Sequence, residues 1–220
     1  MNYLQLNSFK KGNDFIKFQE GKFEVVFSTA ENNKSFNRNT EEGIKELEAL
    51  IDKFHGENVE YLKQIHSNKV YTYRKGSNEF KDNEGDALIT NEKKVIIGVF
   101  TADCVPVILV DKENEAIAAI HSGWKGTFSS IVTETILRMK EEYNSKAENI
   151  VAYIGPHIRQ CCYEVSEDLK EQFLKKFDIE KDKLFDGRNL SLEECINNDL
   201  INSGVLEENI HSLGLCTNCE

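Results

Sequence analysis

Apolar residues recur along this chain with two different periods, and the period changes from segment to segment. Short runs rich in β-branched and aromatic residues predict strands at residues 23–27, 70–73, 87–90, 95–100, 105–110, 116–121 and 150–154. Segments that place apolar residues three and four positions apart predict helices at residues 40–54, 127–143, 166–177 and 191–201. Because strands and helices do not alternate strictly, we expect an α+β fold (mixed α/β), with mixed β-sheets flanked by helices in a single domain over residues 1–220.

Length, composition and charge fit this fold and exclude several functional classes. The chain has 220 residues, of which 40% are hydrophobic, enough for a sizeable core. Acidic residues outnumber basic ones by 38 to 27, which argues against a protein that holds nucleic acid through phosphate contacts. No apolar run approaches the roughly 20 residues of a membrane span, and the N-terminal residues lack the pattern of a signal peptide. We therefore expect a soluble, cytoplasmic protein that binds neither nucleic acid nor membrane.

Six cysteines, five of them in the second half of the chain, introduce candidate chemistry. In a reducing compartment, such cysteines are metal ligands, nucleophiles or small buried side chains rather than disulfide partners. The adjacent Cys161 and Cys162 are poorly placed to bond each other, so we interpret them as packed or pocket-lining thiols. Cys216 and Cys219 form a Cys-x-x-Cys motif without a second such pair, and we expect them to have a structural role.

The segment 101–127 holds the densest set of chemically active residues. Two apolar runs flank the polar tetrapeptide 111–114, which predicts a hairpin with a four-residue loop. If Val110 pairs with Glu115, then Cys104 lies directly opposite His121, with Cβ atoms about 4.5–5.5 Å apart on one face. A slip of one residue would put the two side chains on opposite faces.

Two chemistries fit a cysteine beside a histidine at the end of a hairpin. A thiolate next to an imidazole is a nucleophile pair. A thiolate with two imidazoles provides three ligands of a catalytic zinc. His66, just before an apolar strand, is available as the third ligand, and His55 and His157 compete with it on spacing alone.

The turn from Ser122 to Thr127 leads directly into a predicted helix. Gly123 and Gly126, followed by a helix N-terminus, offer free N–H groups for an anion such as phosphate, and Lys125 adds a positive charge. The alternative is an ordinary strand-to-helix turn that Thr127 caps. Trp124, the only tryptophan, could stack on a base or pack against the turn.

Six motifs along the chain match a known family in order and spacing. They are QIHSNKV (64–70), GDALIT (85–90), TADCVPVILVD (101–111), AAIHSGWKGT (118–127), IGPHIRQCCYEV (154–165) and LCTNC (215–219). Together they resemble the laccase-domain family, first labelled polyphenol oxidases and now described as purine nucleoside phosphorylases with adenosine deaminase activity. The resemblance implies a mixed α/β fold similar to that of the cysteine-hydrolase toxins, and a Zn²⁺ ion held by His66, Cys104 and His121.

The resemblance also implies substrates and partners. It implies phosphorolysis of adenosine, inosine, guanosine and methylthioadenosine, and hydrolytic deamination of adenosine. Asp103 and Asp86 are the candidate acids or bases, Glu164 is less suited, and Asp103 could instead orient a metal ligand. We expect purine nucleosides and phosphate to contact Asn68, Gly123, Trp124, Lys125, Gly126 and Cys162.

The sequence departs from the family pattern at three places. Lys125 stands where the family usually has Arg, which removes a planar bidentate donor. The segment AENNKSFNRNT (30–40) replaces an expected Gly-rich loop. Family members usually continue beyond the position of Glu220 with an aromatic- and Arg-rich strand, so we expect either a short member of the family or a truncated chain.

Three alternatives to a zinc-dependent phosphorylase remain open from the sequence. Cys104 and His121 could form a metal-free cysteine hydrolase or amidase of the peptidoglycan-editing type. Zinc could instead stabilise a non-catalytic domain. A copper polyphenol oxidase ranks last, because the chain has only five histidines. The pattern does not indicate the physiological substrate, the proton shuttle or the oligomeric state.

Overall fold

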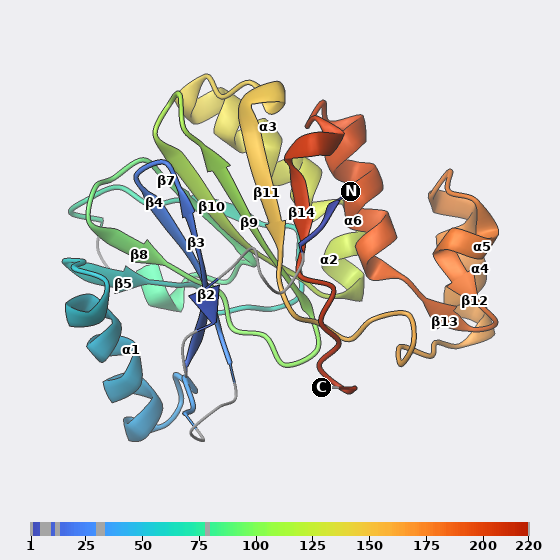
Figure 1. Cartoon of the computed structure of the whole chain (residues 1–220), viewed down its shortest axis with the longest axis horizontal. Helices are drawn as coiled ribbons and strands as arrows, with labels where there is room; N and C mark the ends of the chain where they lie inside the picture. The colour runs from blue at the N-terminus through green and yellow to red at the C-terminus, as the bar shows by residue number, and fades with distance from the viewer. Residues whose placement is uncertain (1, 5–9, 12–13, 30–33, 78–79, 220) are drawn as a thin grey trace.

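A mixed sheet of seven strands forms the centre of the molecule (Figure 1). The structure, a computed structural model, describes residues 2–4, 10–11, 14–29, 34–77 and 80–219. The strand order in this sheet is β1-β14-β11-β9-β10-β7-β6. Its strands are β1 (Asn2–Tyr3), β6 (Val70–Thr72), β7 (Ala87–Thr90), β9 (Val105–Asp111), β10 (Ala116–Ser122), β11 (Ile150–Ile154) and β14 (Ile210–Ser212). Smaller sheets pair β2 (Lys10–Lys11), β3 (Phe15–Glu20) and β4 (Phe23–Ser28), then β5 (Asn58–Glu60) with β8 (Val95–Ile97), and β12 (Phe185–Asp186) with β13 (Asn189–Leu190).

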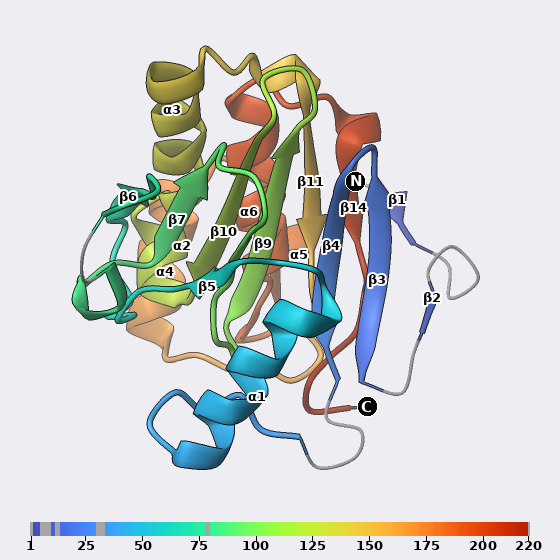
Figure 2. The ribbon, with the colours of Figure 1, turned by 90° about the vertical axis from the view of Figure 1, so that its left-hand side faces the viewer.

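Helices cover one face of the central sheet, and the hairpin β3–β4 packs against the other (Figures 1 and 2). The α-helices are α1 (Glu41–Lys53), α2 (Trp124–Phe128), α3 (Ile131–Tyr143), α4 (Glu167–Lys176), α5 (Lys181–Leu184) and α6 (Leu192–Asn202). The described residues also form short 3₁₀ helices at Phe80–Asp82, between β6 and β7, and at Ala147–Asn149 and Glu207–Asn209, which precede β11 and β14. The prediction of a mixed α/β fold is confirmed. Within the ranges that the structure describes, no helix combines the length and the apolar composition that crossing a membrane requires.

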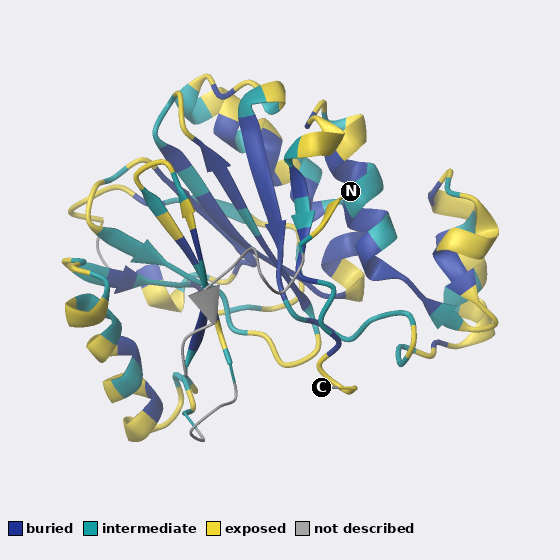
Figure 3. Cartoon of the chain, in the orientation of Figure 1, coloured by how far each residue is buried: buried dark blue, intermediate teal, exposed yellow. Residues whose placement is uncertain are grey.

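Alternation along the central strands explains why both faces of the sheet are covered. Val107 and Leu109 of β9 belong to the core under α3 and α6, whereas Ile108 and Val110 pack toward the hairpin β3–β4. Successive residues of a strand point to opposite faces, so a continuous apolar run such as 105–110 requires cover on both. Figure 3 shows the result: the central strands are buried along most of their length, while α1 and α4 keep exposed faces.

The register of the β9–β10 hairpin differs from the predicted one. His121 pairs with Pro106, and not with Cys104, so the expected pairing of Val110 with Glu115 is wrong by two positions. Because the side-chain period of a strand is two residues, a two-residue error leaves both side chains on the same face. Cys104 and His121 therefore share a face in the observed register, as they do in the predicted one.

The turn of this hairpin supplies the physical reason for the shift. The Asp111 carboxylate accepts hydrogen bonds from the backbone N–H groups of Glu113 (3.0 Å) and Asn114 (3.1 Å), so the turn folds over a residue that still belongs to the strand. Glu115 then takes the left-handed conformation with a φ of 55°. Pairing consequently resumes between Asp111 and Ala116, one residue later than expected on each strand.

Two other predicted elements need correction. The expected helix 127–143 is interrupted, because Ser130 takes a left-handed φ of 55° between α2 and α3. The expected strand 95–100 ends at Ile97, since the Gln64 side chain occupies both backbone groups of Phe100 at 2.7 Å. The expected helices 166–177 and 191–201 are both present, and the hydroxyls of Ser166 and Ser191 cap them by accepting the N–H groups three residues on.

Candidate metal centre

Three side chains from separate segments meet at the open end of the β9–β10 hairpin. Cys104 precedes β9, His121 lies near the end of β10, and His66 comes from the loop before β6. The Cys104 Sγ and the His66 Nε2 are 3.8 Å apart, and the two imidazole rings stand nearly perpendicular with centroids 4.8 Å apart. All three donor atoms lie within 4.8 Å of one another. A tetrahedral zinc with ordinary bond lengths separates nitrogen and sulfur ligands by about 3.5 Å, so the group fits a metal ion.

Gly123 makes this approach possible. One step beyond the last observed pair of the hairpin, Cys104 comes opposite Gly123. A Cβ atom at this glycine would lie 2.9 Å from the Cys104 Sγ and 2.8 Å from the His66 Cδ2. Both distances are too short for carbon contacts, so only glycine leaves room for the cysteine and the histidine.

A single buried carboxylate holds both histidines. The Asp86 side chain is fully buried and accepts from the His121 Nδ1 at 2.8 Å. It also accepts from the backbone N–H groups of His66 (2.9 Å) and Ser67 (2.6 Å), from the Ser67 hydroxyl (2.7 Å), and more distantly from the Ile65 N–H (3.3 Å). The hydrogen bond to Nδ1 leaves Nε2 of His121 as the nitrogen available to a metal, the arrangement that commonly fixes metal-binding histidines.

These contacts set the charge states of Asp86 and His121. Burial acts to raise the pKa of Asp86, but the hydrogen bonds from His121, Ser67 and His66 outweigh it and lower the pKa to about 2. Burial likewise opposes a charged His121, yet its contacts with Asp86 and Cys104 raise the pKa of this imidazole to about 9. Asp86 is therefore an ionised acceptor at neutral pH, which suits it to orient ligands rather than to shuttle protons.

The loop that carries His66 is strained. His66 has a φ of 60°, a left-handed conformation that non-glycine residues rarely adopt. The bonds from the backbone of His66 and Ser67 to Asp86 offset this strain and fix where the imidazole leaves the backbone. Asp86 thus positions one histidine through its ring and the other through its main chain.

The other candidate acid, Asp103, has a different environment. Its side chain is exposed next to Cys104 and accepts a hydrogen bond from the Thr217 hydroxyl at 2.9 Å. Its carbonyl accepts from the Ile158 N–H at 2.9 Å. Glu164, the less suited candidate, is exposed and pairs with Arg188.

The predicted anion-binding turn forms the short helix α2 instead of the start of a long one. Gly123 is its N-cap, and Thr127 lies inside it, where its hydroxyl bonds that of Ser122 at 2.8 Å. Lys125 and Trp124 are both exposed, and the Lys125 ammonium lies 5.5 Å from the indole centroid. Thr127 therefore does not cap the turn.

Two further predicted contact residues, Gly126 in this turn and Asn68 in the loop of His66, connect the two segments. Gly126 packs against the loop of His66, since a Cβ there would lie 3.2 Å from the Ser67 carbonyl oxygen. The Asn68 side-chain amide donates to the Ser129 carbonyl at 3.3 Å. The turn and the loop of His66 are therefore neighbours.

Cys162 lies in a different cluster. Its Sγ is 3.3 Å from that of Cys219, and the sulfurs of Cys161 and Cys216 complete a group whose members lie within 4.8 Å of one another. The sequence interpretation, packed thiols and a separate structural pair, missed this convergence. Adjacent cysteines are not a familiar ligand spacing, and no local signal relates them to residues more than 50 positions away.

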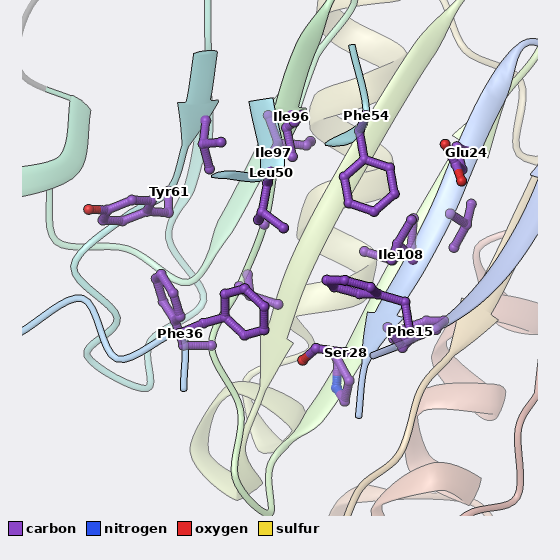
Figure 4. Close-up of a pocket in the computed structure, with 18 of the residues that line it drawn as sticks. Phe15, Glu24, Ser28, Phe36, Leu50, Phe54, Tyr61, Ile96, Ile97 and Ile108 are labelled. Carbon is purple, nitrogen blue, oxygen red and sulfur yellow. The ribbon is translucent and has the colours of Figure 1, made fainter. Parts of the chain in front are cut away.

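A large hollow of about 1680 Å³ borders the four-cysteine cluster, because Cys216 and Thr217 belong to its wall (Figure 4). It separates the hairpin β3–β4 from α1 and the strands β5 and β8, and aromatic and aliphatic side chains line it, among them Phe15, Phe36, Phe54, Tyr61, Ile96 and Ile108. Among the described residues in its wall, Ala102 and Pro106 come nearest in sequence to Cys104, and neither His66 nor His121 contributes. The hollow therefore reaches neighbours of Cys104, while the three side chains of the candidate metal centre are not among its described lining residues.

Comparisons with known proteins agree with the resemblance seen in the motifs. A family model described as multi-copper polyphenol oxidoreductase laccase matches residues 18–220. A Clostridium acetobutylicum protein named purine nucleoside phosphorylase is 44% identical over 205 residues, covering 93% of this chain and 85% of that protein. A protein of the same name from Borreliella burgdorferi is 35% identical over 167 residues, covering 73% and 70%.

A solved structure supports the fold. The Bacillus licheniformis hypothetical protein YfiH matches with a TM-score of 0.84 at 23% identity, covering 97% of this chain and 91% of that one. At this identity the likeness shows the fold alone. Since the family model spans most of the sequence and the Clostridium relative aligns along nearly all of it, the chain belongs to the multi-copper polyphenol oxidoreductase laccase family.

Proposed function

We propose that this chain is a zinc-dependent enzyme that cleaves purine nucleosides with inorganic phosphate. Two relatives, 44% and 35% identical to it, carry the name purine nucleoside phosphorylase. The observation that carries the proposal is the convergence of His66, Cys104 and His121 at the end of the β9–β10 hairpin. Three protein ligands leave a fourth position open, which is typical of a catalytic zinc rather than a structural one.

The donor set favours zinc over copper. A thiolate and two imidazoles suit zinc, which would supply a Lewis acid at this centre. A multi-copper oxidase needs further imidazoles. Of the remaining histidines, His157 donates to the Gly155 carbonyl, His211 packs against Tyr153, and His55 follows the end of α1. None of these three belongs to the group formed by the described metal-binding candidates around Cys104.

Phosphorolysis requires a second anion beside the nucleoside. A phosphate oxygen attacks C1′ of the ribose, the bond from C1′ to the purine nitrogen breaks, and its electron pair leaves with the base, which takes up a proton. The exposed ammonium of Lys125 would hold the phosphate, whereas Gly123 and Gly126 are buried against the segments of Cys104 and His66. Trp124, with 36% of its surface exposed, would present its ring to the base.

Deamination of adenosine would use the same centre without phosphate. Water adds to the purine carbon that bears the amine, and ammonia leaves after taking up a proton. Asp103 is the group we propose for moving that proton, because its carboxylate is exposed beside Cys104. Asp86 is buried, and its oxygens already accept from His121 and the His66 loop, so it would hold the ligands in place.

One specific observation favours a second candidate function. Cys104 contacts His121, whose other nitrogen bonds Asp86, and this cysteine–histidine–aspartate order also occurs in metal-free cysteine hydrolases. Such an enzyme would attack an amide with the Cys104 thiolate. The presence of His66 within 3.8 Å of the same sulfur distinguishes the two, because a hydrolase needs no second imidazole there.

Phosphate dependence tests the proposal directly. The protein is incubated with inosine or adenosine, with and without phosphate, and free base, inosine and ribose 1-phosphate are followed by chromatography. We expect base release only with phosphate, deamination of adenosine with or without it, and loss of both in Cys104→Ser. Lys125→Ala should weaken phosphorolysis about tenfold or more and deamination far less, because only phosphorolysis binds a second anion. Cleavage of an amide substrate by zinc-free protein, with no action on nucleosides, would favour the hydrolase.

A further inference from the structure

Four cysteine sulfurs meet at the edge of the molecule where two loops cross. Cys161 and Cys162 lie in the loop after β11, and Cys216 and Cys219 lie in the segment after β14. The Cys219 Sγ is 3.3 Å from that of Cys162 and 3.6 Å from that of Cys161, and all four sulfurs lie within 4.8 Å of one another. All four are free thiols. The proposed function uses none of their sulfurs.

The distances match a tetrahedral metal site. Four zinc–sulfur bonds of about 2.3 Å set neighbouring sulfurs about 3.8 Å apart, and the observed separations of 3.3 Å and 3.6 Å lie near this value. Four thiols without a metal gain little from such crowding, because a thiol is only a weak hydrogen-bond donor and acceptor. The close approach of these four sulfurs therefore favours a metal ion that all four bind.

The backbone holds the two loops in register around the sulfurs. His157 and Cys216 form a parallel bridge, with the His157 N–H donating to the Leu215 carbonyl (3.2 Å) and the Thr217 N–H to the His157 carbonyl (3.0 Å). The Arg159 guanidinium adds a hydrogen bond of 2.9 Å to the Gly214 carbonyl. The loops are thus joined independently of the cysteines.

Cys216 also receives backbone donors. The N–H groups of Arg159, Asn218 and Cys219 point to its sulfur. Such donors stabilise a thiolate, the form of cysteine that binds a metal. Cys216 is the buried member of the cluster, whereas Cys161 and Cys219 face solvent, so an ion could enter from outside.

We propose that Cys161, Cys162, Cys216 and Cys219 bind a second zinc ion, closed by four thiolates and separate from the centre at Cys104. A site with four protein ligands has no open position and is structural rather than catalytic. It would join the loop after β11 to the segment after β14. Thr217 lies between two of the ligands and donates to Asp103, the neighbour of Cys104, so the cluster would also position one wall of the catalytic centre.

Metal content of matched variants tests this inference. We expect about two zinc ions per chain in the wild type, about one in Cys216→Ser/Cys219→Ser, and about one in His66→Ala/His121→Ala. Cys195→Ser is the control, because Cys195 is buried outside both groups and should leave about two. Nucleoside cleavage is not a readout, so this test is independent of the proposed function.

Cobalt substitution keeps the test decisive if the cysteine variant fails to fold. Cobalt-loaded wild type and His66→Ala/His121→Ala should both show the intense sulfur-to-metal absorption of a four-thiolate site. Loss of that absorption, or of all zinc, in the histidine variant would overturn the inference. Protein purified without reductant that carries a Cys162–Cys219 disulfide and binds only one zinc would overturn it as well.

Discussion

The Asp86 carboxylate shows how one residue can organise a site without touching substrate. It binds the ring of His121 and the main chain of His66 and Ser67, and these bonds offset the cost of burying a charge. In the sequence, Asp86 is an acid within a motif and therefore a candidate proton carrier. Its burial and its five donors, which no sequence pattern displays, support the positioning role proposed for it.

The stability of the metal-free protein should depend on pH, because His121 is hydrogen-bonded to Asp86 in the folded chain. The pKa of His121 is about 9 in the folded chain against an ordinary value of 6.5, so its contribution is fully present below pH 6.5 and is lost as the pH rises through 9. Urea unfolding should therefore show lower stability at pH 9 than at pH 6.5. Asp86→Asn should cost about 2 kcal/mol at neutral pH and remove this loss.

The exposed Asp82 provides the matched control for that experiment. Asp82→Asn should leave both the stability and its pH dependence unchanged, because among the residues that the structure describes no buried side chain pairs with this carboxylate. Parallel stability curves for wild type and Asp86→Asn between pH 6.5 and 9 would contradict the role assigned to Asp86.

At the scale of elements, the β9–β10 hairpin shows what sequence patterns can and cannot determine. Its two apolar runs and polar loop were evident, because alternation and turn composition are local properties. Its register was predicted two residues off, because the choice depended on how the Asp111 side chain caps the turn. The break at Ser130 was missed for a similar reason: apolar spacing continues across it, and only packing selects a left-handed residue there.

A side chain at Gly123 should weaken zinc binding. Gly123→Ala places a Cβ 2.9 Å from the Cys104 Sγ and 2.8 Å from the His66 ring, so β10 must move away from both ligands. We expect zinc affinity to fall about 10- to 100-fold, as when the support of a metal ligand is removed. Competition with a chelator of known affinity measures the change.

Gly98→Ala is the control for this change. A Cβ at Gly98 meets nothing within 4 Å, so zinc affinity should not change. Equal affinities of the two variants would show that the close approach at Gly123 does not matter for binding.

At the scale of the molecule, the sheet order brings together what the sequence separates. β9 lies between β10 and β11, and β14 lies beside β11, so the segments that carry Cys104, Cys162 and Cys216 meet at one end of the sheet. The motifs indicated which residues carry chemistry. They did not indicate that the cysteines form a second group, because non-local pairing depends on strand order, which local periodicity does not determine.

The proposed function requires metal at the His66–Cys104–His121 centre for phosphate-dependent cleavage of nucleosides. The most direct measurement follows base release from inosine in phosphate before chelation, after removal of the chelator with its metal, and after addition of zinc. We expect activity to disappear with the metal and to return with zinc in the wild type, while His66→Ala stays inactive throughout. Full phosphate-dependent activity in metal-free protein, or in His66→Ala, would contradict the account.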